Sequence, residues 1–256
     1  MPNSSFSLNK LATFKTTDFP ERPTLVFLHD SLGCIALWRD FPVLLGNVTR
    51  CNVLVYDRQG YGQSKPFDSI ERANDYMEIE ADILNDVLDE NKIEKAILFG
   101  HSDGGSIALI AAAKYPEKIL GIITEGAHVF VESVTIKGIK EAIIAYETTN
   151  LKQKLEKYHG NNTNDLFWAW AKTWTTPTFA DWNIEHFLSQ ISCPALVIQG
   201  EDDEFGTLLQ VDKIVNQVNG NVEKLVIPNV KHTPHKEVPE LILEESKRFI
   251  EKILNN

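Results

Sequence analysis

Residues Ala96–Pro116 read AILFGHSDGGSIALIAAAKYP, in which an apolar run meets a glycine-flanked serine and then an alanine-rich run. The first run has the length of a buried strand and the second that of a helix. Gly100 and Gly104 stand two residues before and two residues after Ser102. A sharp turn from strand to helix needs small residues at these places, and it lifts the serine hydroxyl clear of the backbone. The segment therefore predicts a strand, a nucleophile elbow and a helix, with Ser102 as the nucleophile.

Further apolar runs alternate along the chain with segments of helical spacing. The other predicted strands are Thr24–His29, Asn52–Asp57, Ile119–Gly126, Ala195–Gly200 and Lys224–Pro228. Apolar residues recur at helical spacing from Tyr76 to Leu88 and from Leu241 to Ile253. This alternation predicts the α/β class, with a mostly parallel, doubly wound sheet, and 256 residues suffice for one such domain. In such sheets the ligand site lies beyond the carboxyl ends of the strands.

The strand pattern stops between residues 127 and 190, where helical and aromatic-rich sequence replaces it. We therefore expect residues 1–126 and 191–256 to form the core domain and residues 127–190 to form an inserted helical cap. Four of the five tryptophans fall in this insertion: Trp168, Trp170, Trp174 and Trp182. Such rings form either the core of the cap or an aromatic cover over a pocket. Trp168 and Trp174 are the candidates for contact with a substrate.

A nucleophilic serine needs a base, and the base needs an orienting acid, each after a later strand in the order serine, acid, histidine. Asp203 follows the run that ends at Gly200, and His232 follows the last predicted strand. We predict Asp203 as the acid and His232 as the base. Asp202 and His235 are the alternatives for these two roles.

Charge and cysteine spacing exclude several other classes of function. The formal net charge is −11 and no basic patch is visible, so neither a nucleic acid nor an anionic membrane is an expected partner. Cys34, Cys51 and Cys193 lie far apart, and no pair of histidines has metal-ligand spacing. The predicted chemistry needs only a nucleophile, a base and hydrogen-bond donors, so we expect no metal and no organic cofactor.

The location of the protein is predicted from two further features. The start MPNSSFSLNK lacks the basic and then apolar pattern of an export signal. No apolar run approaches the eighteen residues that a membrane span requires. We expect a cytoplasmic protein that acts on a small molecule, and the sequence leaves its oligomeric state open.

Three segments resemble the α/β-hydrolase superfamily. LFGHSDGG (Leu98–Gly105), VIQGEDD (Val197–Asp203) and VKHTPHKEVPE (Val230–Glu240) resemble its nucleophile, acid and histidine segments. SDGGSIALIAAAKYP together with CPALVIQGEDD resembles the biphenyl-hydrolase-like serine esterases, the group that contains valacyclovir hydrolase. The resemblance extends over nearly the whole chain, and it implies the α/β-hydrolase fold and serine hydrolase activity.

The resemblance also implies an oxyanion hole. LVFLHDSLGCIALWRDF resembles the superfamily's oxyanion segment, although Asp30 stands where that segment usually has glycine. By position, the Ser31 backbone N–H is one donor, with Leu32 as the alternative, and the Asp103 N–H is the second donor. His29 ends the first parallel strand, where a histidine more often braces the oxyanion loop than takes part in the chemistry, and it is also a candidate for contact with the substrate.

Together these residues predict a serine hydrolase that cleaves a small carboxylic ester through an acyl-enzyme. The Asp103 carboxylate either receives the ammonium of an amino-acid ester, as the resemblance implies, or stabilises the N-terminus of its own helix. Asp103 itself is a poor candidate for the nucleophile. The turn needs a small residue two positions before the nucleophile, and for Asp103 that residue would be the bulky His101. Hydrolysis of a carbon–carbon bond in a ring-cleavage product, of a lactone or of a thioester stays open. A hydrolase-fold protein that acts only as a small-molecule receptor is also an open alternative, although a complete triad favours an enzyme.

Overall fold

One sheet of seven strands organises the molecule, and the computed structural model describes residues 11–255 of the chain. The strands are β1 (Thr13–Thr16), β2 (Thr24–Leu28), β3 (Asn52–Tyr56), β4 (Ala96–His101), β5 (Ile119–Glu125), β6 (Ala195–Gly200) and β7 (Val222–Ile227). Their order across the sheet is β1-β3-β2-β4-β5-β6-β7. The strands from β2 to β7 pair in parallel, whereas β1 pairs with β3 antiparallel at the edge.

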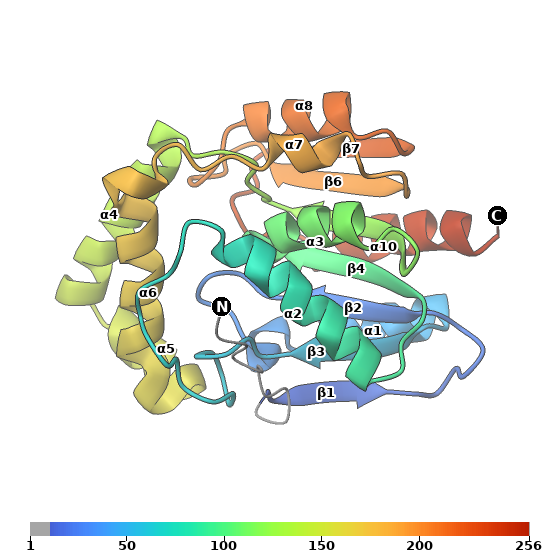
Figure 1. The fold of residues 1–256 in the computed structure, drawn as a ribbon, viewed down its shortest axis with the longest axis horizontal. Coiled ribbons are helices and arrows are strands. Elements are labelled where there is room, and N and C mark those ends of the chain that lie inside the picture. Colours follow the sequence, from blue (N-terminus) through green and yellow to red (C-terminus); the bar gives the residue numbers. More distant parts are fainter. Residues whose placement is uncertain (1–10, 256) are drawn as a thin grey trace, which may run out of the picture.

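Helices follow most of the strands and complete the doubly wound arrangement (Figure 1). They are α1 (Phe41–Thr49), α2 (Tyr76–Glu90), α3 (Asp103–Lys114), α4 (Ser133–Thr148), α5 (Leu151–His159), α6 (Thr163–Thr175), α7 (Glu185–Leu188), α8 (Leu208–Gln217), α9 (Pro234–Glu237) and α10 (Pro239–Leu254). Short 3-10 turns are η2 (Ile35–Trp38), η3 (Gly160–Asn162) and η4 (Pro177–Phe179). The predicted α/β class and mostly parallel sheet are thereby confirmed.

The core lies on both faces of the sheet, because successive side chains of a strand point to opposite faces. In β2, Leu25 and Phe27 pack in one apolar cluster with α1 and α10. Val26 and Leu28 pack in the other cluster, with α2 and α3. Burial on both faces explains why the strands read as continuous apolar runs instead of alternating ones.

The edge strand β1 was not among the predicted strands. Its sequence is TFKT, and its residues are mostly exposed. This short, exposed edge strand lacks the continuous apolar run that identified the six parallel strands. Its pairing with β3 depends on a partner about 40 residues away in the sequence, which no local pattern records.

Helices α4 to α7 lie between β5 and β6, within the region predicted as a cap. In Figure 1, α4, α5 and α6 stand together at the end of the sheet toward which the parallel strands run. Their packing is aromatic: the rings of Tyr146 and Phe167 stack with centroids 3.8 Å apart. The division at residues 127 and 190 stays a prediction.

The longest helices in the described part of the chain are α4 and α10, with 16 residues each. No helix within residues 11–255 combines the length and the apolar character that crossing a bilayer requires. The N-terminal segment on which the expectation about export rests lies outside the described residues.

Candidate active site

Ser102 is the single residue between the end of β4 and the start of α3, and it forms a sharp turn. Its φ of 54° and ψ of −119° are conformations that non-glycine residues rarely adopt. Its N–H donates to the Glu125 carbonyl at 2.8 Å, which ties the turn to β5. A Cβ at Gly104 would lie 2.0 Å from the Leu28 oxygen, and one at Gly100 would lie 2.2 Å from the Gly104 oxygen. The two glycines are therefore needed for the turn to pack against the neighbouring strand.

His232 and Asp203 meet at the carboxyl end of the sheet, after β7 and β6. The His232 Nδ1 lies 2.9 Å from each Asp203 carboxylate oxygen. The same carboxylate accepts hydrogen bonds from the Phe205 N–H at 2.8 Å and from the Gln199 Nε2 at 2.9 Å. These donors orient the acid, and the acid in turn orients the imidazole. His232 and Ser102 line one cavity of about 160 Å³.

The charges of this pair act on each other. Burial lowers the pKa of His232, but the adjacent Asp203 carboxylate outweighs it and leaves that pKa above its ordinary value. Burial raises the pKa of Asp203, but His232 and the hydrogen-bond donors outweigh this effect and leave that pKa below its ordinary value. Asp203 is thus held as a carboxylate, and it strengthens His232 as a proton acceptor.

Gly126 supports the imidazole at the end of β5. Its φ is +56°, and a Cβ there would lie 2.8 Å from the His232 Cε1 and 3.3 Å from an Asp203 oxygen. A side chain at position 126 would displace the His232 imidazole.

We expect Gly126→Ala to lower kcat by about tenfold to a hundredfold, because a displacement of about 1 Å at a reacting group has effects of this size. Steady-state kinetics on a small ester measure it. Gly160→Ala is the matched control, since Gly160 also has a positive φ of +53° but has no atom within 4 Å of the added Cβ. An equal loss of kcat in both variants would assign the effect to backbone strain.

The residues predicted to supply the oxyanion donors line the same cavity. Asp103 is the first residue of α3, so its N–H has no acceptor within the helix. Ser31 and Leu32 follow β2, and both line the cavity. Beneath them, the Arg58 Nη2 donates to the Asp30 carbonyl at 3.0 Å and to the His29 carbonyl at 3.3 Å. The Arg58 side chain is 2% exposed.

The structure does not bring His29 to the cavity. Its Nδ1 donates to the Asp30 carbonyl at 2.8 Å, and its Nε2 accepts the Arg58 backbone N–H at 3.1 Å. His29 therefore braces the oxyanion loop from below. Arg58 escaped the sequence analysis, because the only signal for it was a basic residue directly after a buried strand.

Helices α4 and α6 form the wall of the cavity opposite Ser102. The contributing residues are Thr135, Ile139, Trp170 and Trp174. Trp174 lies where it was expected, whereas Trp168 does not line the cavity. The Trp168 ring packs edge-on against Phe167 and lies 5.8 Å from the Lys172 ammonium. Residues four apart share one face of a helix, so the spacing of Trp170 and Trp174 was the available signal.

Asp103 is buried at the inner end of the cavity, with 1% of its side chain exposed. Its Oδ2 accepts the Tyr76 hydroxyl at 3.1 Å and lies 3.7 Å from the Arg58 Nη1. The Tyr76 oxygen in turn accepts the Trp174 Nε1 at 3.1 Å. Within the described chain, the Asp103 Oδ1 has no hydrogen-bond partner.

The cavity wall is acidic. Carboxylates come from Asp30, Asp103 and Glu204, and none of the described residues that line the wall is lysine or arginine. A field of this sign attracts a cationic ligand and disfavours an anionic one.

The alternatives for base and acid lie elsewhere. The His235 Nδ1 is 2.5 Å from a Glu125 oxygen, and the His235 ring packs 4.5 Å from that of Trp38. This side chain is 3% exposed and does not line the cavity. Asp202 is exposed, so neither residue joins the group around Ser102.

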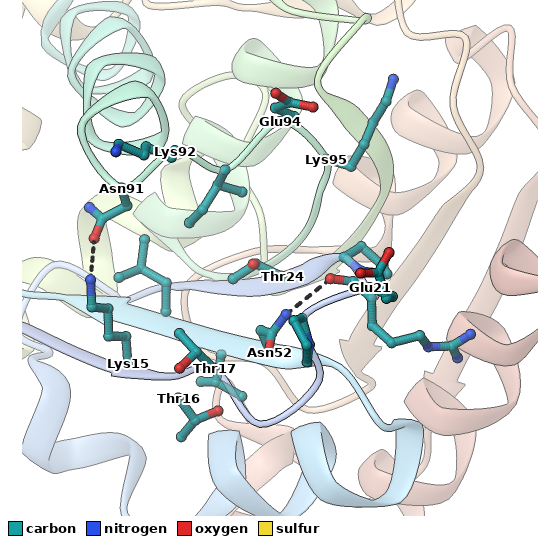
Figure 2. A pocket seen from close by; sticks show the side chains of 16 residues that line it. Lys15, Thr16, Thr17, Glu21, Thr24, Asn52, Asn91, Lys92, Glu94 and Lys95 are labelled. Atoms are coloured by element: carbon teal, nitrogen blue, oxygen red, sulfur yellow. Dashed lines mark hydrogen bonds between the residues drawn. The ribbon is translucent and has the colours of Figure 1, made fainter.

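A larger depression, of about 480 Å³, lies at the amino ends of β2 and β3, on the far side of the sheet from Ser102. Figure 2 shows its lining, with Lys15 hydrogen-bonded to Asn91 and with Asn52 near its centre. No histidine or cysteine is among the sixteen residues drawn. The depression therefore offers neither the histidine base nor a thiol.

Metal-ligating and thiol chemistry receive no support from the described residues. Among residues 11–255, no cluster of three or more histidine, cysteine, aspartate or glutamate side chains could hold a metal ion. The three cysteines are free, and burial raises the pKa of Cys34 and Cys193 to about 11.

Known proteins share this sequence and this architecture. A family model described as alpha/beta hydrolase fold matches residues 23–185. "Serine hydrolase BPHL" of Homo sapiens is 34% identical over 207 residues, which cover 77% of this chain and 69% of that protein. A "2-hydroxy-6-oxononadienedioate/2-hydroxy-6-oxononatrienedioate hydrolase" of Paraburkholderia phymatum is 29% identical and covers 72% of each chain. A solved carboxylesterase structure from Nitrososphaera gargenis superposes with a TM-score of 0.79 at 18% identity, covering 97% of this chain and 98% of that one.

Proposed function

This chain belongs to the α/β-hydrolase family and is a hydrolase of the BPHL type, and from this premise we propose that it cleaves small carboxylic esters through an acyl-enzyme on Ser102. One observation carries the proposal. Ser102, on its positive-φ turn, shares a cavity with a histidine whose other nitrogen is hydrogen-bonded to a buried carboxylate. An activated serine requires this combination of nucleophile, base and orienting acid.

The proposed reaction proceeds in two halves. The His232 Nε2 takes the hydroxyl proton of Ser102 as its oxygen attacks the ester carbonyl, and the backbone N–H groups of Asp103 and Ser31 stabilise the oxyanion. Asp203 stabilises the imidazolium that forms. The imidazolium then gives its proton to the departing alcohol oxygen, which leaves the acyl group on Ser102. Water, deprotonated by the same histidine, attacks the acyl-enzyme and releases the acid.

We propose that the preferred acyl group carries an ammonium next to the carbonyl. The Asp103 Oδ1 is buried without a partner, and the cavity wall carries carboxylates but neither lysine nor arginine in its described lining. An ammonium at the Oδ1 would supply the missing hydrogen bond and balance charge. The competing role for Asp103 is structural, through its place at the start of α3 and its distance of 3.7 Å from Arg58.

A second candidate is carbon–carbon bond hydrolysis, which the relative from Paraburkholderia phymatum suggests by its name. That name denotes a dicarboxylate substrate. The carboxylates of Asp30, Asp103 and Glu204 would repel such a ligand, so the acidic wall favours the ester over the dicarboxylate. Lactone or thioester cleavage would use the same groups around Ser102.

The test of the acyl preference is Asp103→Asn on two benzyl esters, of alanine and of propionic acid, which differ only in the α-ammonium. We expect kcat/KM for the alanine ester to fall about ten- to a hundredfold, because a hydrogen bond to a charged group is lost. The propionate ester should change by about twofold or less. Product formation is measured by chromatography. An equal change for both esters would assign Asp103 the structural role and remove the ammonium preference.

A further inference from the structure

His128 is a cavity residue to which the proposed mechanism gives no part. It follows β5 by three positions and lines the cavity together with Ser102 and Asp103. Its side chain is buried, and no hydrogen-bond partner for its Nδ1 occurs among the described residues. Buried polar atoms are normally paired, so an unpaired nitrogen beside a ligand cavity points to a bond made by the ligand.

Ser106 holds the backbone of His128, and Trp174 packs against its ring. The Ser106 hydroxyl donates to the His128 carbonyl at 2.6 Å and accepts the His128 N–H at 3.1 Å, which joins this backbone to α3. The ring packs edge-on against Trp174, with centroids 5.3 Å apart. A residue held in this way loses little side-chain freedom when a ligand binds.

The same part of the cavity holds the unpaired oxygen of Asp103. Trp174 links the two residues: its ring packs against His128, and its Nε1 donates to the Tyr76 hydroxyl, which donates to the Asp103 Oδ2. Two unpaired buried atoms, the His128 Nδ1 and the Asp103 Oδ1, thus belong to residues that line the same cavity. A ligand group that satisfies both must donate at least two hydrogen bonds.

We propose that His128 is a specificity-determining residue whose Nδ1 accepts one N–H of the substrate's primary ammonium while Asp103 accepts another. This inference rests on the proposed function, and it narrows the ligand class from cations in general to ammonium groups that retain N–H donors. A trimethylammonium group carries the same charge but offers no N–H to either residue.

The protonation of His128 agrees with the role of an acceptor. Burial, followed by the nearby His232, lowers the pKa of His128 to about 4. The imidazole is therefore neutral at pH 7, and in the tautomer with its proton on Nε2 it neither repels the ammonium nor competes for Asp103. A histidine that served only the core would be expected to have both nitrogens paired or replaced by carbon.

The experiment compares wild type, His128→Phe and His128→Asn on the benzyl esters of alanine, N,N,N-trimethylalanine and propionic acid. Phenylalanine keeps the ring shape without nitrogens, whereas the asparagine Oδ1 takes a place near that of Nδ1. In His128→Phe we expect KM for the alanine ester to rise about tenfold or more, with kcat within about twofold, because the lost bond is made away from the reacting carbonyl. His128→Asn should restore most of the affinity. The other two esters should respond to neither substitution by more than about twofold.

The other possible results contradict the role of His128, the ammonium preference or the proposed ester hydrolysis, as follows. If wild type prefers the alanine ester and His128→Phe keeps that preference, the role of His128 is wrong and the proposed function stands. If His128→Phe lowers kcat/KM equally for all three esters and also lowers the melting temperature measured by circular dichroism, His128 serves only the fold. If wild type cleaves the three esters alike, the ammonium preference falls together with this inference. If wild type cleaves none of them, the proposed ester hydrolysis fails first.

Discussion

Ser102→Ala is expected to lower kcat for a small ester by about a million-fold, which leaves no turnover above background. The hydroxyl oxygen of Ser102 is the atom that would attack the carbonyl, and among residues 11–255 no other serine or threonine has a positive φ. Removing it leaves only binding and oxyanion stabilisation. The melting temperature should change little, since alanine at a φ of 54° is no more strained than serine.

The measurement combines ester hydrolysis with labelling by a fluorophosphonate probe, which reacts with activated serines. Wild type should be labelled at Ser102, as mass spectrometry of the peptides would reveal, and Ser102→Ala should not be labelled. Ser31→Ala is the matched control, because it removes a cavity-lining hydroxyl but keeps the backbone N–H assigned to the oxyanion. Labelling of a different residue in wild type, or strong hydrolysis by Ser102→Ala, would contradict the assignment of the nucleophile. A silent wild type would favour a receptor that only binds its ligand.

Asp203→Asn should lower kcat by about ten thousand-fold, because an amide no longer holds the productive tautomer of the imidazole or stabilises its positive charge. The pH profile should move as well. His232 acts only when unprotonated, so kcat/KM rises with pH through its pKa, which Asp203 holds above the ordinary value of about 6.5. Without this carboxylate, only Asp30 and Glu204 oppose the effect of burial, so the pKa of His232 falls and the acid limb shifts to lower pH.

Profiles of kcat/KM against pH for wild type and Asp203→Asn measure both effects in one series. Asp202→Asn provides the control, since this neighbouring carboxylate is exposed and has no contact with the imidazole. We expect it to stay within about twofold of wild type across the range. An acid limb that moved to higher pH in Asp203→Asn, or an equal loss in Asp202→Asn, would contradict the assignment of the acid.

Local patterns in the sequence determined the strands of the sheet and the sharp turn at Ser102. Six strands could be predicted from their continuous apolar runs, which in the five inner strands reflect burial on both faces. The turn at Ser102 could be predicted because its close packing leaves room only for glycine at positions 100 and 104. The positions of Ser102, Asp203 and His232, each after a strand, could be predicted because functional residues of a parallel sheet lie beyond the carboxyl ends of its strands.

The lining of the cavity was decided only by tertiary structure. Trp170 faces the cavity and Trp168 does not, because the rotation of α6 is set by its packing against α4 and the core. His29 turns beneath its loop to bond Arg58, a residue 29 positions away. The unpaired nitrogen of His128 is likewise invisible in the sequence. A local pattern records what a residue needs from its neighbours along the chain, whereas the shape and charge of a pocket depend on which distant side chains the packed helices bring together.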